Sequence, residues 1–206
     1  MKYQELILLL ALMSGGTAMS ATGTARAETG HHHHHHAMAA SSGYQRVSAS
    51  YDVPDVRLVD MNGAPVALRD GLGGDEPILL NFIFTSCTAI CPVMSATFRQ
   101  VQEQLGDERG KVRMVSISID PENDTPARLR EYADRFEAGP QWRMLTGSLK
   151  DSIAVQRAFA TYRGDKMNHA PATFLRVGGA GTPWVRLDGM ASAADIIQEY
   201  RNLAAH

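Results

Sequence analysis

The sequence predicts an α/β protein in which a central mixed sheet is flanked by helices. Residues 77–84 are almost continuously apolar, and residues 112–119 form a second run that is mainly apolar. Runs of this length are typical of strands buried on both faces of a sheet. A segment with helical periodicity follows each run, and this alternation is typical of α/β folds with parallel strands.

The first 27 residues are predicted to be a secretory signal rather than part of the fold. Lys2 precedes an apolar run over residues 6–13, and small residues lead to Ala25-Arg26-Ala27. A basic start, a short apolar core and an A-x-A exit are typical of a signal peptide. The run is well short of the roughly 20 apolar residues of a membrane-spanning helix. We therefore expect an exported, periplasmic protein, with anchoring by an uncleaved signal as the alternative.

Residues 28–50 are expected to hold an expression tag, His31 to His36, and a flexible lead-in, so that the folded domain covers residues 51–206. Outside the tag and the chain terminus, His169 is the only histidine. The formal net charge is −2 and no basic cluster is present, which argues against nucleic acid as a partner. We expect a monomer.

The first half of the domain is predicted to contain a hairpin, a buried strand and a helix. Residues 56–60 and 64–68 flank Met61-Asn62-Gly63, which is a hairpin signal. The buried strand over residues 77–84 comes next. The following helix should have Pro92 in its first turn and end at Gly106. Its apolar stripe is expected to comprise Val93, Phe98, Val101 and Leu105.

The second half is predicted to continue the alternation and to finish with a hairpin and a helix. The expected strands cover residues 112–119, 143–145, 172–177 and 184–187, and the expected helices begin near residue 126 and cover residues 148–162 and 192–205. Asp120 and Asp124 belong to a turn and helix cap between the strand and helix. This order of elements predicts a thioredoxin-like fold with an N-terminal β-hairpin.

Cys87 and Cys91, the only cysteines in the chain, lie where the first buried strand leads into a helix. At a helix start, unpaired N–H groups and the helix dipole favour a thiolate at Cys91. Two sulfurs four residues apart can close a disulfide or bind one metal ion together. With the imidazole of His169, two thiolates would favour copper or zinc, and three ligands match trigonal Cu(I). The structural alternative is an inert disulfide, of the kind that exported proteins commonly form.

Three segments together resemble the Sco/SenC family. They are the run from Phe84 to Pro92 (FTSCTAICP), the run from Ile117 to Thr125 (ISIDPENDT), and His169 six residues before Leu175. The similarity extends over about residues 53–200. It implies a thioredoxin-like fold, copper as Cu(I) or Cu(II) bound by Cys87, Cys91 and His169, and a role in building the dinuclear copper site of a respiratory oxidase.

The chain departs from the family pattern at three positions. Met94 stands where family members often carry an acidic residue, and Asn168 replaces the aspartate that often precedes the histidine. Pro171 stands where thioredoxins keep a cis-proline facing the redox pair, which favours thiol–disulfide chemistry. Met94 and Met167 are soft enough to bind Cu(I), although methionines more often serve packing.

The sequence therefore supports a copper metallochaperone that delivers copper to an oxidase subunit. The alternative is a thiol–disulfide reductase, served by a thiol reductant protein, that keeps the client's copper-binding cysteines reduced. A peroxidase of peroxiredoxin type has Thr85, two residues before Cys87, in its favour, but it lacks the proline-led loop ahead of the cysteine. His169 favours copper, because thiol–disulfide exchange does not require a histidine there.

Overall fold

The computed structural model describes residues 43–205, so the predicted signal and tag lie outside the described residues. Within residues 43–205, no helix combines the length and the hydropathy needed to cross a bilayer.

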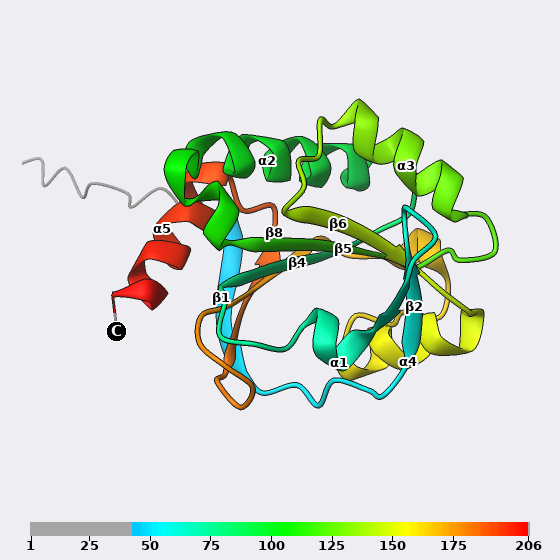
Figure 1. Ribbon diagram of the computed structural model, residues 1–206, viewed down its shortest axis with the longest axis horizontal. Coiled ribbons are helices and arrows are strands. Elements are labelled where there is room, and N and C mark those ends of the chain that lie inside the picture. The colour runs from blue at the N-terminus through cyan, green and yellow to red at the C-terminus, as the bar shows by residue number, and fades with distance from the viewer. Residues whose placement is uncertain (1–42, 206) are drawn as a thin grey trace, which may run out of the picture. The chain divides into compact units, whose positions relative to one another are not determined.

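Eight strands form one mixed sheet in the order β1-β8-β7-β4-β5-β6-β2-β3 (Figure 1). Their bounds are Tyr44–Ala49 (β1), Arg57–Asp60 (β2), Pro65–Ala67 (β3), Ile78–Ile83 (β4), Arg113–Ser118 (β5), Trp142–Thr146 (β6), Ala172–Arg176 (β7) and Trp184–Gly189 (β8). β5 runs parallel to both β4 and β6, and the other pairs are antiparallel. The expected mixed sheet, with the hairpin β2–β3 at one edge, is confirmed.

Helices cover both faces of the sheet (Figure 1). Their bounds are Leu68–Gly71 (α1), Ile90–Gln104 (α2), Pro126–Arg135 (α3), Leu149–Ala158 (α4) and Ala193–Ala204 (α5), with 3₁₀ turns at Gly106–Lys111 (η1) and Lys166–Asn168 (η2). In Figure 1, α2 and α3 lie above the sheet and α1 and α4 below it, while α5 packs against α2.

Strand β4 is the centre of the core, and all six of its residues are buried, as the apolar run predicts. Phe82 lies in an aromatic cluster with Phe159 and Phe174, at centroid distances of 5.8 and 5.9 Å. On α2, Phe98 contacts the ring of Trp142 at 5.6 Å. These buried contacts fix the end of β4, from which the cysteine segment leaves the sheet.

The expectation of a flexible lead-in up to residue 50 is wrong, because β1 pairs with β8 over its whole length. Four of the six β1 side chains are exposed, so the strand lacks an apolar alternation that would reveal it. Gly189 turns the chain at a φ of +114°, and a Cβ there would lie 2.5 Å from the carbonyl oxygen of Gly43. The ordered fold therefore begins before residue 51.

Helix α2 begins at Ile90 and does include Pro92 in its first turn. The side chain of Met94 is buried, whereas Val93 is 52% exposed, so the expected place of Val93 in the apolar stripe is wrong. Phe98, Val101 and Leu105 are buried as expected.

Helix α4 ends at Ala158, earlier than expected. Residues 159–171 then form the connection to β7, which is interrupted only by η2.

Candidate copper and thiol site

The two cysteines occupy the connection between β4 and α2. Cys91 is fully buried in the first turn of α2, and Cys87 is partly buried on the loop before it. The N–H of Cys87 donates to the carbonyl of Phe84 at 3.2 Å, which turns the loop back towards β4. Both cysteines are free thiols, and their side chains lie in hydrogen-bond contact. The structure therefore brings together the two sulfurs that the sequence pairs.

The two thiols have opposite acidities. Burial acts to raise the pKa of Cys87, but hydrogen bonds from the backbone N–H groups of Cys91, Ala89 and Ile90 outweigh it and leave that pKa lowered. Burial raises the pKa of Cys91 to about 12, with a further contribution from Cys87. The helix start stabilises a thiolate as predicted, but at Cys87 rather than at Cys91. The thiol of Cys87 is therefore the more acidic and the more accessible of the two.

Asp124 fixes the loop that carries Cys87. Its carboxylate is fully buried and accepts hydrogen bonds from the N–H of Thr85 at 3.2 Å and from the hydroxyl of Thr85 at 2.6 Å. The hydroxyl of Ser118, at the end of β5, donates to the same carboxylate at 2.5 Å. The cap of α3 is supplied by the next residue, Thr125, whose side chain accepts from the N–H of Arg128. The sequence indicated the turn, but not that its aspartate reaches the cysteine loop.

His169 lies at the end of the connection to β7, and its Nε2 is 3.1 Å from the carbonyl oxygen of Phe82. A carbonyl oxygen only accepts, so Nε2 carries the hydrogen and Nδ1 of the neutral ring keeps its lone pair. Burial lowers the pKa of His169 below its usual value, and nearby Arg163 lowers it further. The imidazole is therefore predominantly neutral at pH 7, which is the form that binds metals.

Strand pairing explains why the carbonyl of Phe82 is available to accept a hydrogen bond from His169. The register of β4 with β7 ends at the pair Asn81↔Thr173, one residue before Phe82. The His169 ring thus satisfies a carbonyl at the end of the sheet that holds the cysteine loop.

The structure does not bring all three predicted ligands together. Within residues 43–205, no group of three or more His, Cys, Asp or Glu side chains is arranged to hold a metal ion. The carboxylate of Asp120 accepts from Asn123 and pairs with Lys166 at 2.5 Å. Of the two methionines considered as soft ligands, Met94 is buried and Met167 is 74% exposed.

Pro171 follows a trans peptide bond, since the described chain contains no cis peptide. The proline therefore differs from the cis-proline that thioredoxins place opposite their redox pair.

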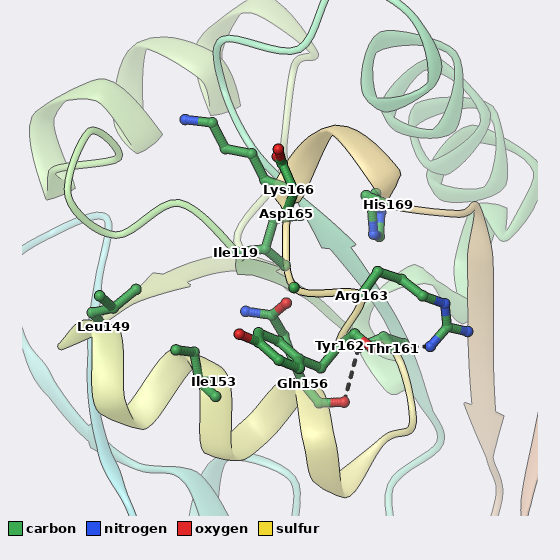
Figure 2. Close-up of a pocket in the computed structure, with 11 residues that line it drawn as sticks. Ile119, Leu149, Ile153, Gln156, Thr161, Tyr162, Arg163, Asp165, Lys166 and His169 are labelled. Carbon is green, nitrogen blue, oxygen red and sulfur yellow. Dashed lines mark hydrogen bonds between the residues drawn. The ribbon is translucent and has the colours of Figure 1, made fainter.

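A cavity of about 60 Å³ lies beside His169 (Figure 2). It is lined by Ile119, Ile153, Gln156 and Tyr162, and by Lys166 from the segment above them. Figure 2 shows the 161–169 segment passing over the side chains of α4. The cavity thus lies beneath the histidine segment, residues 161–169.

The fold and this site define a class of proteins: thioredoxin-like domains with a Cys-x₃-Cys pair at the start of a helix and a histidine on a neighbouring connection. The sequence profile of the SCO1/SenC family matches residues 46–205, and the chain belongs to that family.

Curated relatives agree with this assignment. The chain is 36% identical to the SCO1 protein homolog of Bacillus subtilis over 105 residues, which are 50% of this chain and 53% of that protein. It is 35% identical over 107 residues to a putative copper-binding protein of Stutzerimonas stutzeri, covering 52% of this chain and 50% of that protein. The matched region thus spans about half the length of these relatives.

Solved structures show the same fold. BsSco, described as a member of the Sco family of cytochrome c oxidase assembly proteins, superposes with a TM-score of 0.65 and 29% identity, over 77% of this chain and 96% of that one. Copper-bound ScoI of Bradyrhizobium japonicum gives a TM-score of 0.57 and 25% identity, over 71% and 96% of the two chains.

Proposed function

We propose that this protein is a copper metallochaperone that binds copper through Cys87, Cys91 and His169 and delivers it for assembly of the dinuclear copper site of a respiratory oxidase. The pair of contacting thiols at the start of α2, in a member of the SCO1/SenC family, carries this proposal. Its relatives include a protein named as copper-binding and a ScoI solved with copper bound. Export to the periplasm, as the N-terminal sequence predicts, would place it on the side of the membrane where we expect its client.

The donor set suits copper. Two sulfurs and a neutral imidazole are soft to intermediate ligands, which favour Cu(I) over hard cations. The N–H groups that lower the pKa of Cys87 also stabilise the thiolate that a metal requires. Cys91 would lose its proton on metal binding, since a coordinated thiol is deprotonated.

Copper stoichiometry tests this function directly. The protein lacking only the His31–His36 run should take up about one copper when reduced and almost none when Cys87 and Cys91 form a disulfide, because both thiolates are then consumed. Cys87→Ser or Cys91→Ser should abolish tight binding. His169→Ala should weaken it and shift the thiolate-to-Cu(II) charge-transfer band. Equal uptake by the reduced and oxidised forms would refute the cysteine site.

A thiol–disulfide reductase is the second candidate, and the acidity difference between the thiols favours it. The Cys87 thiolate would attack a client disulfide and form a mixed disulfide, releasing one client thiolate. Cys91 would then lose its proton and attack Cys87, releasing the second client thiol and leaving the Cys87–Cys91 disulfide. A separate thiol reductant protein would restore the dithiol.

Insulin reduction separates the two functions. A chaperone should reduce insulin slowly, although its own disulfide is reducible. Fast reduction that survives His169→Ala would make the reductase the leading function.

A further inference from the structure

The connection that carries His169 has two anchors to the end of the sheet beside the cysteines. One is the hydrogen bond from His169 to Phe82, and the other is the ion pair between Lys166 Nζ and Asp120 at 2.5 Å. The other hydrogen bonds of residues 163–170 are local, such as the one from the N–H of Met167 to the carboxylate of Asp165. Beyond His169, the carbonyl of Pro171 accepts from the N–H of Gly189 at 3.0 Å, where the connection joins the sheet. In Figure 2 the Lys166 side chain extends away from His169, so the two anchors act in different directions.

The loop that carries Cys87 and the first turn of α2 are the firmly held part of the site. Asp124 holds Thr85 through two groups, and Cys91 is fully buried in α2. The histidine segment, in contrast, lies above the cavity of about 60 Å³. Since the three ligands are not assembled in the described chain, it is the histidine segment that must move for His169 to join the two sulfurs.

This movement breaks one anchor and leaves the other. If the imidazole turns or shifts towards the sulfurs, it gives up its bond to Phe82, and Lys166–Asp120 then holds the segment. Lys166 Nζ also lies 5.7 Å from the centre of the Phe84 ring, at the base of the cysteine loop.

Asp120 and Asp124 belong to one tight turn, in which the N–H groups of Asn123 and Asp124 donate to the carbonyl of Asp120 at 3.0 and 2.8 Å. The same turn therefore holds the cysteine loop through Asp124 and the histidine segment through Asp120.

We propose that Lys166 is a positioning residue for the metal site: its ion pair with Asp120 keeps the His169 segment within reach of Cys87 and Cys91 when His169 leaves Phe82. This inference rests on the proposed copper function. Its physical basis is effective concentration, because a tethered imidazole meets the bound metal more often than an untethered one. Lys166 itself touches no metal.

A double-mutant cycle tests the role of Lys166. The probe is Cu(I), measured by competition with a chelator on the reduced full chain lacking only the His31–His36 run. Lys166→Met should weaken Cu(I) binding about tenfold through loss of the tether. In the His169→Ala background, the same substitution should change affinity less than about twofold, since no imidazole remains to be positioned. Lys166→Arg should restore binding, because it keeps the charge.

A matched control separates positioning from stability. Arg143 pairs with the buried Asp60 at 2.9 Å, and the two ion pairs have similar side-chain exposures, 38% and 7% against 33% and 5%. Arg143→Met should therefore lower thermal stability about as much as Lys166→Met and leave Cu(I) affinity unchanged. In the copper-free protein, Lys166→Met alone should speed amide hydrogen exchange over residues 163–170.

The outcomes distinguish this inference from the proposed function. Tight copper binding by Cys87→Ser would refute the cysteine site, whatever Lys166 does. If Cys87→Ser and His169→Ala weaken binding as expected, but Lys166→Met costs the same affinity with and without His169, or costs none, the positioning role is wrong. Unchanged hydrogen exchange over residues 163–170 in Lys166→Met would also overturn it.

Discussion

At the scale of single residues, the site depends on how the ends of strands and helices satisfy their polar groups. The free N–H groups at the start of α2 lower the pKa of Cys87. At the end of β4, the carbonyl of Phe82 accepts a hydrogen bond from Nε2 of His169. Both effects use backbone groups that regular secondary structure leaves without partners. The chemistry of the side chains is therefore set by the termini of the elements around them.

The difference in acidity predicts which thiol reacts first. With limiting iodoacetamide near pH 8, Cys87 should be alkylated before Cys91, since a pKa of about 12 leaves only about one Cys91 in ten thousand ionised. Peptide mapping by mass spectrometry measures the order. The urea-unfolded chain is the control, and there the two cysteines should react at similar rates. Preferential labelling of Cys91 in the folded protein would contradict the assignment.

The lowered pKa of His169 predicts a pH dependence of stability. The unfolded chain binds the proton more tightly, so folding is favoured by this residue above pH 6.5, and that contribution is lost as the pH falls towards the folded-state pKa. The free energy of unfolding should therefore fall between about pH 7.5 and pH 5 more steeply in the native protein than in His169→Gln. Urea unfolding at both pH values measures the difference. Equal slopes would show that His169 has the same pKa in both states.

At the scale of elements, much of the fold could be predicted because burial leaves a pattern in the sequence. The continuous run of β4 and the capped start of α3 are local signals, and both elements lie where the sequence places them. The sequence does not reveal strand β1, because backbone groups make its pairing with β8 and leave no pattern in the side chains. The contacts of Asp124 and Lys166 were missed for a related reason: each joins loops that are distant in sequence, and no local pattern records which aspartate caps a helix and which reaches a neighbouring loop.

The same limit applies to the candidate site. The cysteine pair and its position at a helix start follow from one short run, residues 87–92. The relation of His169 to the pair depends instead on the path of the whole connection after α4.

The link between the β5–α3 turn and the cysteine loop predicts a large stability effect. Asp124→Ala should lower the free energy of unfolding by about 3 kcal/mol, because it removes hydrogen bonds to a charged group and leaves the donors of the half-buried Thr85 and the buried Ser118 without an acceptor. Asp124→Asn should cost less, since it keeps one acceptor oxygen. Urea denaturation gives both values. Asp151, a partly exposed partner of the Ser148 cap, provides the control, and Asp151→Ala should cost under about 1 kcal/mol. If Asp124→Ala lowered the free energy of unfolding as little as Asp151→Ala does, the hydrogen bonds of Asp124 would not be what holds the cysteine loop.

At the scale of the whole molecule, the sheet ends in two protected edges. β3 is three residues long and begins with Pro65, which offers no N–H to another strand. At the other edge β1 covers β8 and is fastened to α5 by the ion pair of Arg46 with Glu199 at 2.8 Å. Between these edges, the ends of β4 and β5 and the start of α2 carry the site.

The close approach at Gly189 predicts that this edge is sensitive to one methyl group. Gly189→Ala should lower the free energy of unfolding by more than about 1 kcal/mol and loosen β1, because a Cβ would meet the carbonyl of Gly43 at 2.5 Å. Gly181 has a similar φ of +101° with open space around it, so Gly181→Ala controls for backbone strain alone. Thermal unfolding compares the two variants. Equal losses would mean that the contact with Gly43 is unimportant.

The exposed side chains of β1 have a consequence for mutational tolerance. Since the strand is held by its backbone pairing with β8, four consecutive positions, residues 45–48, contribute little to the core. Substitutions among strand-forming residues at these positions should be close to neutral, apart from the loss of the Arg46–Glu199 ion pair. Related sequences are thus free to diverge along this strand while Gly189 opposite it is constrained, and an engineered recognition sequence could be carried on β1 without disturbing the cysteine site at the end of β4.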